Sequence, residues 1–230
     1  MPRKDISEKL SETFLAKMQD KNWKLRKEAM DELKDIISTA KFVSANVGGL
    51  GPVLAARFTD TNKIISVQAV EIAKDLCAAM GPHVKGQMQY LVPGLLGSLS
   101  DSKPLVRAGV VGCMDTLLEQ TLLKEFFVDE MALTAMSKGN HFTKQEVLKW
   151  LSVHLPEARS VPKEDLMSMI PALYAAVEDR NADVRKAAQD AVPAFMRHLG
   201  FQKMQVRQSF SSDDDLNFCK FRTLCESVRG

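Results

Sequence analysis

The sequence DKNWKLRKEAMDEL, residues 20–33, sets a layout that returns four more times along the chain. The later copies are DTNKIISVQAVEIA from Asp60, DSKPLVRAGVVGCM from Asp101, KGNHFTKQEVLKWL from Lys138 and DRNADVRKAAQDAV from Asp179. Successive copies begin 40, 41, 37 and 41 residues apart. A period of about 40 residues is typical of stacked helix pairs of the HEAT or armadillo kind. The repeat therefore predicts an all-α fold, a HEAT-repeat solenoid.

The third position of each copy favours the start of a helix. Four copies have asparagine there: Asn22, Asn62, Asn140 and Asn181. An asparagine side chain caps the free N–H groups of a first helical turn. In the remaining copy Lys103 is followed by Pro104, and proline at the first helical position gives up no hydrogen bond. The sixth position is branched in every copy, beginning with Leu25, and is expected to face the core.

Apolar spacing extends each copy into an antiparallel helix pair. The five predicted pairs are 6–19 with 23–37, 50–58 with 63–80, 83–99 with 104–120, 124–136 with 141–155, and 163–177 with 182–199. One pair cannot bury its apolar face alone, so the pairs are expected to stack with all five turns on one edge. They form one predicted domain, residues 1–204. Residues 205–230 break the pattern and are either an atypical helical end cap or a partly ordered tail.

Composition limits the function classes. The chain of 230 residues is 45% hydrophobic and 26% charged, which is ordinary for a globular protein, and its net charge of +2 does not indicate nucleic-acid binding. No signal peptide or membrane-spanning run is present, so we expect a cytoplasmic protein without a membrane partner. The four cysteines fit no zinc pattern, and Cys77 and Cys113 are expected in the core.

Catalytic signals are missing from the sequence. It contains no phosphate-binding glycine loop, no HExxH motif and no nucleophile elbow. Its four histidines lie singly on predicted helices, where capping or surface positions are more common than metal ligation. The sequence therefore predicts a binding module that is not an enzyme and needs no cofactor or metal.

The predicted turns carry the basic charge of the chain. The first eight residues of the five copies together have a net charge of +7, which leaves −5 for the rest. Helix N-termini add positive dipole ends at the same place. This edge therefore favours an acidic partner surface. Trp23, at a first helical position outside the core-facing phase, is expected to be exposed and to act as an interface anchor.

A structural role competes with binding for several of these charges. An aspartate and an arginine six residues apart recur as Asp20 with Arg26, Asp101 with Arg107, and Asp179 with Arg185. Such pairs can form a ladder between neighbouring repeats. The exposed candidates can equally form a solvated rim: Lys21, Lys24, Lys63, Lys103 and Arg180.

Taken together, DKNWKLRKEAMDEL, DTNKI, SDSKPLVRA and EDRNADVRKAAQDAVPAFMRHLG closely resemble a TOG domain of the array-bearing microtubule polymerases, the ch-TOG and Minispindles family. The similarity covers residues 1–204 and is greatest to one of the later domains of the array, the fourth. It implies a HEAT paddle whose intra-repeat loops bind αβ-tubulin or the microtubule lattice, beside neighbouring TOG domains of the same chain. Plus-end growth and spindle assembly, at microtubule plus ends, spindle and centrosome, are the implied roles.

Position by position, the resemblance implies these tubulin-binding residues: Lys21, Trp23, Lys24, Lys63, Lys103, Asn140, Lys144, Arg185 and Lys186. Two departures stand out. Residues from 205 onward do not match a sixth repeat, and Ser66 stands in the second loop where the other loops have a basic residue. The alternative is a HEAT scaffold that orients neighbouring domains and binds tubulin weakly, or binds another protein.

Overall fold

The computed structural model describes residues 2–204, 223, 225 and 226. These residues form helices and turns, with no strand beyond one isolated parallel bridge between Lys4 and Val43. The chain divides into two compact units, Met1–Glu125 (unit 1) and Phe126–Gly230 (unit 2), and each is described by itself. No helix within the described ranges is long and apolar enough to cross a membrane.

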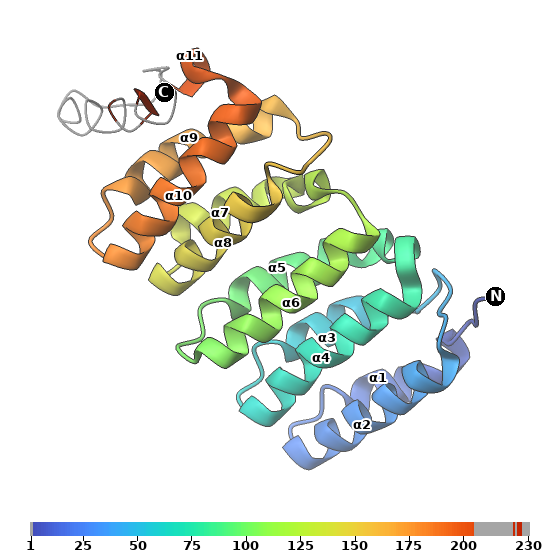
Figure 1. Cartoon of the computed structure of the whole chain (residues 1–230). Helices are drawn as coiled ribbons and strands as arrows, with labels where there is room; N and C mark the ends of the chain where they lie inside the picture. Colours follow the sequence, from blue (N-terminus) through green and yellow to red (C-terminus); the bar gives the residue numbers. More distant parts are fainter. Residues whose placement is uncertain (1, 205–222, 224, 227–230) are drawn as a thin grey trace. The chain divides into compact units, whose positions relative to one another are not determined.

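Unit 1 is built from helix pairs. Its elements are η1 (Ser7–Lys9), α1 (Glu12–Lys17), α2 (Trp23–Ala40), α3 (Leu50–Arg57), α4 (Lys63–Met80), η2 (Gly81–Gln87), α5 (Met88–Ser98) and α6 (Pro104–Gln120), followed by η3 (Leu123–Phe126). Helices α2, α4 and α6 lie side by side in one layer, and α1, α3 and α5 form the other (Figure 1). The core lies between these layers.

Unit 2 repeats this arrangement. It contains η4 (Val128–Glu130), α7 (Met131–Lys138), α8 (His141–His154), α9 (Lys163–Val177), α10 (Ala182–Leu199) and the short α11 (Phe201–Met204). Helix α8 packs against α10, and α7 against α9, as in the two layers of unit 1. In both units the described residues confirm the all-α prediction.

The helices begin where the caps predict. Each capping asparagine accepts a backbone N–H from the first turn: Asn22 from Lys24, Asn62 from Ile64, Asn140 from Thr143, and Asn181 from Asp183. Pro104 begins α6. Because these signals are local, the bounds of α4, α6 and α10 agree with the prediction to the residue, and those of α9, which has no asparagine cap, agree as well.

Three predicted helices are wrong at their N-terminal ends. The segment 6–19 is interrupted, because Ser11 caps a new helix by accepting the N–H of Phe14 at 3.3 Å. The segment 83–99 starts as a 3-10 turn, and α5 begins only at Met88. In 124–136, Asp129 and Glu130 have φ of 52° and 56°, a left-handed conformation that no helix can continue through.

An N-terminal strap joins separate repeats of unit 1. The Arg3 guanidinium donates from Nη1 to the carbonyl of Val43 at 3.1 Å and to that of Ala79 at 2.8 Å. Ala79 lies in the last turn of α4, where carbonyls have no partner within the helix. Arg3 therefore ties the start of the chain to the connection after α2 and to the end of α4.

The cysteine predictions are confirmed where they can be compared. Cys77 and Cys113 are fully buried, and a hydrogen bond that the Cys77 thiol makes to Cys113, together with burial, raises the pKa of Cys77. Cys225 is also buried. The expectations for Cys219 and for most of 205–230 lie outside the described residues.

Candidate protein-interaction edge

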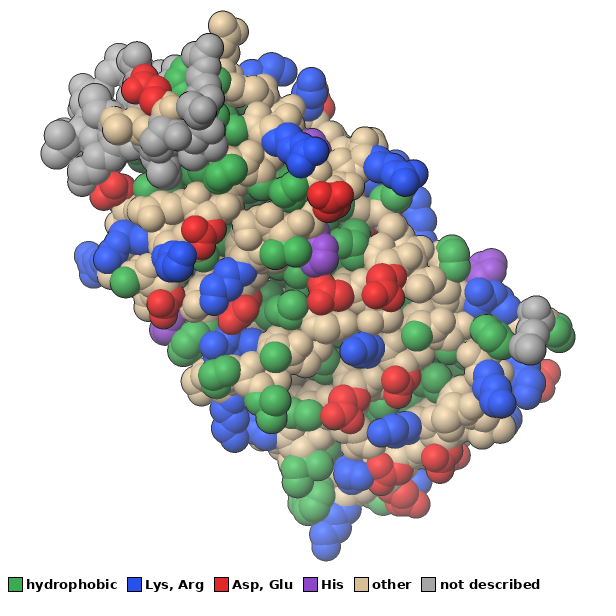
Figure 2. Space-filling view, in the orientation of Figure 1, with side chains coloured by type: hydrophobic (Ala, Val, Ile, Leu, Met, Phe, Trp, Pro, Cys, Tyr) green, Lys and Arg blue, Asp and Glu red, His purple; other side chains and the backbone are tan. Residues whose placement is uncertain are grey.

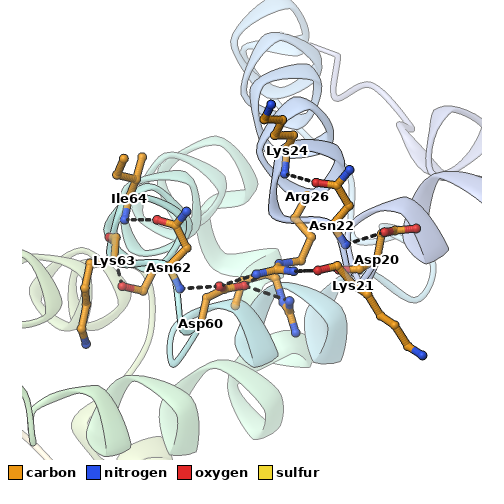
Figure 3. Close-up of polar contacts among 11 residues, drawn as sticks. Asp20, Lys21, Asn22, Lys24, Arg26, Asp60, Asn62, Lys63 and Ile64 are labelled. Carbon is orange, nitrogen blue, oxygen red and sulfur yellow. Dashed lines mark hydrogen bonds and ion pairs between the residues drawn. The ribbon is translucent and has the colours of Figure 1, made fainter.

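The loops that open α2, α4 and α6, with the first turns of those helices, form what we call the unit-1 edge: residues 20–27, 60–67 and 101–108 (Figure 1). Figure 3 shows residues of the first two of these loops. Each loop contains the same hydrogen bond to its leading aspartate. The leading aspartate accepts the backbone N–H two residues on, with 2.7 Å from Asp20 to Asn22 and 2.9 Å from Asp101 to Lys103. This contact fixes the turn before the helix begins.

An arginine holds the same turn from the other side. Arg26 donates from Nη1 to the carbonyls of Asp20 at 2.7 Å and Lys21 at 3.1 Å (Figure 3). Arg107 binds the carbonyls of its own loop in the same way, and so does Arg185 in unit 2. These contacts give the arginines a structural role within their own loops, while a ladder to the neighbouring repeat stays a prediction for Arg107 and Arg185.

The first two loops are also joined to each other. Arg26 makes a two-pronged contact with Asp60, at 2.8 Å from Nε to Oδ2 and 2.7 Å from Nη2 to Oδ1, and Arg57 reaches Oδ2 at 2.9 Å. Burial alone would raise the pKa of Asp60, but the hydrogen bonds from Arg26 and from the Asn62 N–H bring it below its ordinary value. Asp60 is thus an ionised group in the interior, matched by arginines.

The second and third loops are joined differently. Ser66 stands where an arginine would reach forward, and Lys63 replaces it, with Nζ 2.6 Å from Oδ2 of Asp101. This hydrogen bond, with the Lys103 N–H, lowers the pKa of Asp101. In unit 2 a lysine fills the forward position directly, because Lys144 Nζ lies 3.1 Å from Oδ2 of Asp179. Lys63 and Lys144 therefore each form an ion pair within the protein, in addition to any contact with a partner.

Trp23 lies at the surface, as the sequence predicts. Its side chain is 44% exposed at the first position of α2. The expectation for Leu25 is wrong, since it is 37% exposed while its neighbour Arg26 is buried. The core-facing phase of α2 runs through Arg26, Ala29, Met30 and Leu33, and Leu25 falls outside it.

Two apolar residues of this edge were missed at the sequence level. Ile64 is 60% exposed and Leu105 is 85% exposed, each at the second position of its helix. The first loop has Lys24 at the corresponding position. An apolar residue at a position that is charged in another repeat is a signal from which the exposure of Ile64 and Leu105 could have been predicted. With Trp23, they give every loop of the unit-1 edge an outward apolar side chain.

The remaining candidates lie at exposed helix starts. Lys21, Lys24 and Lys103 are exposed and form no ion pair within the part of the chain that the structure describes. In unit 2, Asn140 is the cap of α8, and Lys186 pairs with Asp190 one turn along α10 at 3.1 Å. The prediction that all five loops share one edge spans both units and stays a prediction.

The helix bodies behind the unit-1 edge carry the opposite charge. Beyond their first turns, α2, α4 and α6 contain these carboxylates: Glu28, Asp31, Glu32, Asp35, Glu71, Asp75, Asp115 and Glu119. Figure 2 shows acidic side chains across this face of unit 1. This separation of charge would orient the acidic surface of a binding partner toward the loops.

Stacked helix pairs are typical of the HEAT class, and here an aspartate–arginine contact, Asp60 with Arg26, joins the first two turns. Residues 4–210 match the family model described as CLASP N terminal, and the chain belongs to this family. It is 42% identical over 206 residues to Protein mini spindles of Drosophila melanogaster, an alignment covering 89% of this chain and 10% of that protein. The chain thus spans about a tenth of the length of curated relatives such as this one.

Solved structures agree with this fold. The TOG domain of C. elegans Zyg9 superposes with a TM-score of 0.72 at 18% identity, covering 93% of this chain and 81% of that one. A structure of tubulin recruitment and assembly by microtubule polymerases with TOG domain arrays gives a TM-score of 0.73 at 17% identity, covering 97% and 48%. The predicted resemblance to a TOG domain is confirmed, while its place as the fourth of an array stays a prediction.

Proposed function

We propose that this chain is a non-catalytic tubulin-binding module. Through its loops it engages αβ-tubulin or the microtubule lattice, and it promotes plus-end growth and spindle assembly in the cytoplasm and cytoskeleton. Support comes from the family and from relatives named for mini spindles and for a centrosomal protein. The proposal requires no cofactor, since binding alone is the activity.

The observation that carries the proposal is the exposed Trp23. A tryptophan at the surface leaves a large apolar area in water, and such residues are favoured as anchors of protein interfaces. Lys21 and Lys24 flank it, so an apolar anchor lies among cations that suit an acidic partner. Ile64 and Leu105 extend the apolar contact to the other two loops of the unit-1 edge.

In unit 2 the proposed contacts are Asn140, Lys144, Arg185 and Lys186. Lys144 and Arg185 also make internal contacts, so a partner has to share them with the fold. This observation favours the second candidate function, a HEAT scaffold that orients neighbouring TOG domains and binds tubulin weakly or another protein. The two functions differ in how strongly the unit-1 edge alone binds tubulin.

The test is Trp23→Ala, with tubulin co-sedimentation and thermal melting measured on the same sample. We expect an affinity loss of about 30-fold, which corresponds to a hot-spot cost of roughly 2 kcal/mol. The melting temperature should stay nearly unchanged, because changes at exposed sites are usually within about 0.5 kcal/mol.

The matched control is Tyr90→Ala. Tyr90 is an aromatic residue of the same unit and is 40% exposed. It lies near the start of α5, whereas the third loop of the unit-1 edge follows the other end of that helix. It should bind tubulin as the unchanged protein does. Equal binding by the Trp23→Ala variant and the unchanged protein would reject the tubulin-binding edge.

A further inference from the structure

The ion pairs that join neighbouring loops differ in how deeply they are buried. In the Arg26–Asp60 pair the side chains are 9% and 1% exposed, and in the Lys144–Asp179 pair 25% and 18%. In the Lys63–Asp101 pair the lysine is 58% exposed while the aspartate is 9% exposed. Of these three pairs, only Lys63–Asp101 therefore joins a largely buried carboxylate to a cation that already faces solvent.

Lys63 can leave Asp101 at a lower cost than Arg26 can leave Asp60, because the Lys63 ammonium group already faces solvent. Its ammonium group makes one contact, with Oδ2, on a flexible four-carbon stem. The other oxygen of Asp101 keeps its hydrogen bond from the Lys103 N–H at 2.9 Å, so the third loop stays capped. Arg26 has no such freedom, because its departure would leave the interior carboxylate of Asp60 short of two hydrogen bonds.

The surroundings of Lys63 place it at the candidate interface. The next residue, Ile64, is exposed in the same turn, and Lys103 is the N-cap residue of α6 in the neighbouring loop. A partner that covers Ile64 brings its own carboxylates within reach of the Lys63 ammonium. Asp101 then competes with the partner for one cation.

We propose that Asp101 is an autoinhibitory group of the unit-1 edge, and that Lys63 moves from Asp101 to a carboxylate of the bound partner. The inference rests on the proposed function, in which that partner is tubulin. It assigns Asp101, a residue that touches no partner itself, the role of setting affinity. Lys63 then contributes less to binding than an unpaired lysine of the same exposure.

The experiment is a double-mutant cycle with purified αβ-tubulin dimers, using Asp101→Asn, Lys63→Ala and the double variant. Asparagine keeps an oxygen for the Lys103 N–H and removes the charge that holds Lys63. We expect Asp101→Asn to tighten binding by roughly two- to fivefold, the range of an exposed ion pair. In the Lys63→Ala background the gain should disappear.

The control is Asp20→Asn. Asp20 occupies the same position of the first loop and caps the Asn22 N–H, but forms no ion pair among the described residues. Both substitutions remove one negative charge from the unit-1 edge, so their difference isolates the release of Lys63. Melting curves of all variants establish that they remain folded.

The outcomes separate the two proposals. If Asp101→Asn gains no more than Asp20→Asn, or keeps its gain without Lys63, the autoinhibitory role is wrong. In that case a binding defect of Trp23→Ala still supports the tubulin-binding function. If the unchanged protein does not bind tubulin, both proposals are overturned together.

Discussion

Replacing Asp60 by asparagine should destabilise unit 1 far more than the same change at Asp101. Asp60 accepts four hydrogen bonds, two on each oxygen, from Arg26, Arg57 and the Asn62 N–H. The oxygen of asparagine can keep two of them. The asparagine NH₂ group then faces the N–H groups of Arg26 Nε and Arg57 Nη1. All three groups are hydrogen-bond donors, so the two arginine N–H groups lose their acceptor.

The magnitude follows from those lost contacts. Each unsatisfied buried donor costs about 1–3 kcal/mol, and breaking a buried ion pair costs about 3–5 kcal/mol. We expect the free energy of unfolding to fall by about 3–4 kcal/mol and the melting temperature by about 10 °C. Urea unfolding followed by far-UV circular dichroism at pH 7 measures the loss.

Asp101→Asn provides the comparison at the next loop. It removes an ion pair whose lysine is exposed, and exposed pairs contribute at most about 1 kcal/mol. The two variants should therefore differ by at least about 2 kcal/mol. Equal losses, or a loss below about 1 kcal/mol for Asp60→Asn, would refute the claim that burial of the carboxylate sets its importance.

Three further predictions concern conditions and caps. Stability should decline as pH falls below about 4, because Asp60, Asp101 and Asp179 have pKa values below the ordinary 3.8 and the unfolded chain takes up protons first; acid unfolding curves that match those of Asp60→Asn would contradict this. Tubulin binding should weaken steeply between about 0.05 and 0.3 M salt, where the Debye length falls below about 10 Å; an affinity independent of salt would reduce the lysines to a solvated rim. Asn62→Ala should cost about 1 kcal/mol of unfolding free energy through loss of the cap on α4, with Thr61→Ala as a control that leaves the cap in place.

The sequence predicted those parts of the fold that depend on local chemistry. Asparagine caps and Pro104 determine where helices begin, so these starts could be placed to the residue. The interruption before α1 could not, because Ser11 competes as a cap inside a continuous apolar pattern whose members, including Leu10 and Phe14, are all buried as expected. The spacing of the apolar residues correctly predicted which side chains are buried, but it did not predict where the helix is interrupted.

The candidate site divides in the same way. Exposure of Trp23 follows from the phase of its own helix, so sequence reasoning found it. The commitment of Lys63 to Asp101 depends on two loops 38 residues apart meeting in space, and no pattern within either loop encodes that distance. The missing basic residue at Ser66 marked the second loop as different without showing that Lys63 takes over the bridge.

The strap formed by Arg3 has a consequence for the order of events on the ribosome. Its acceptors lie 40 and 76 residues further along the chain. Because synthesis runs from the N-terminal to the C-terminal side, Arg3 leaves the exit tunnel before α4 and gains its Ala79 acceptor only once the whole of α4 has emerged. The first residues of unit 1 to be made therefore complete their contacts only after α4 has been made.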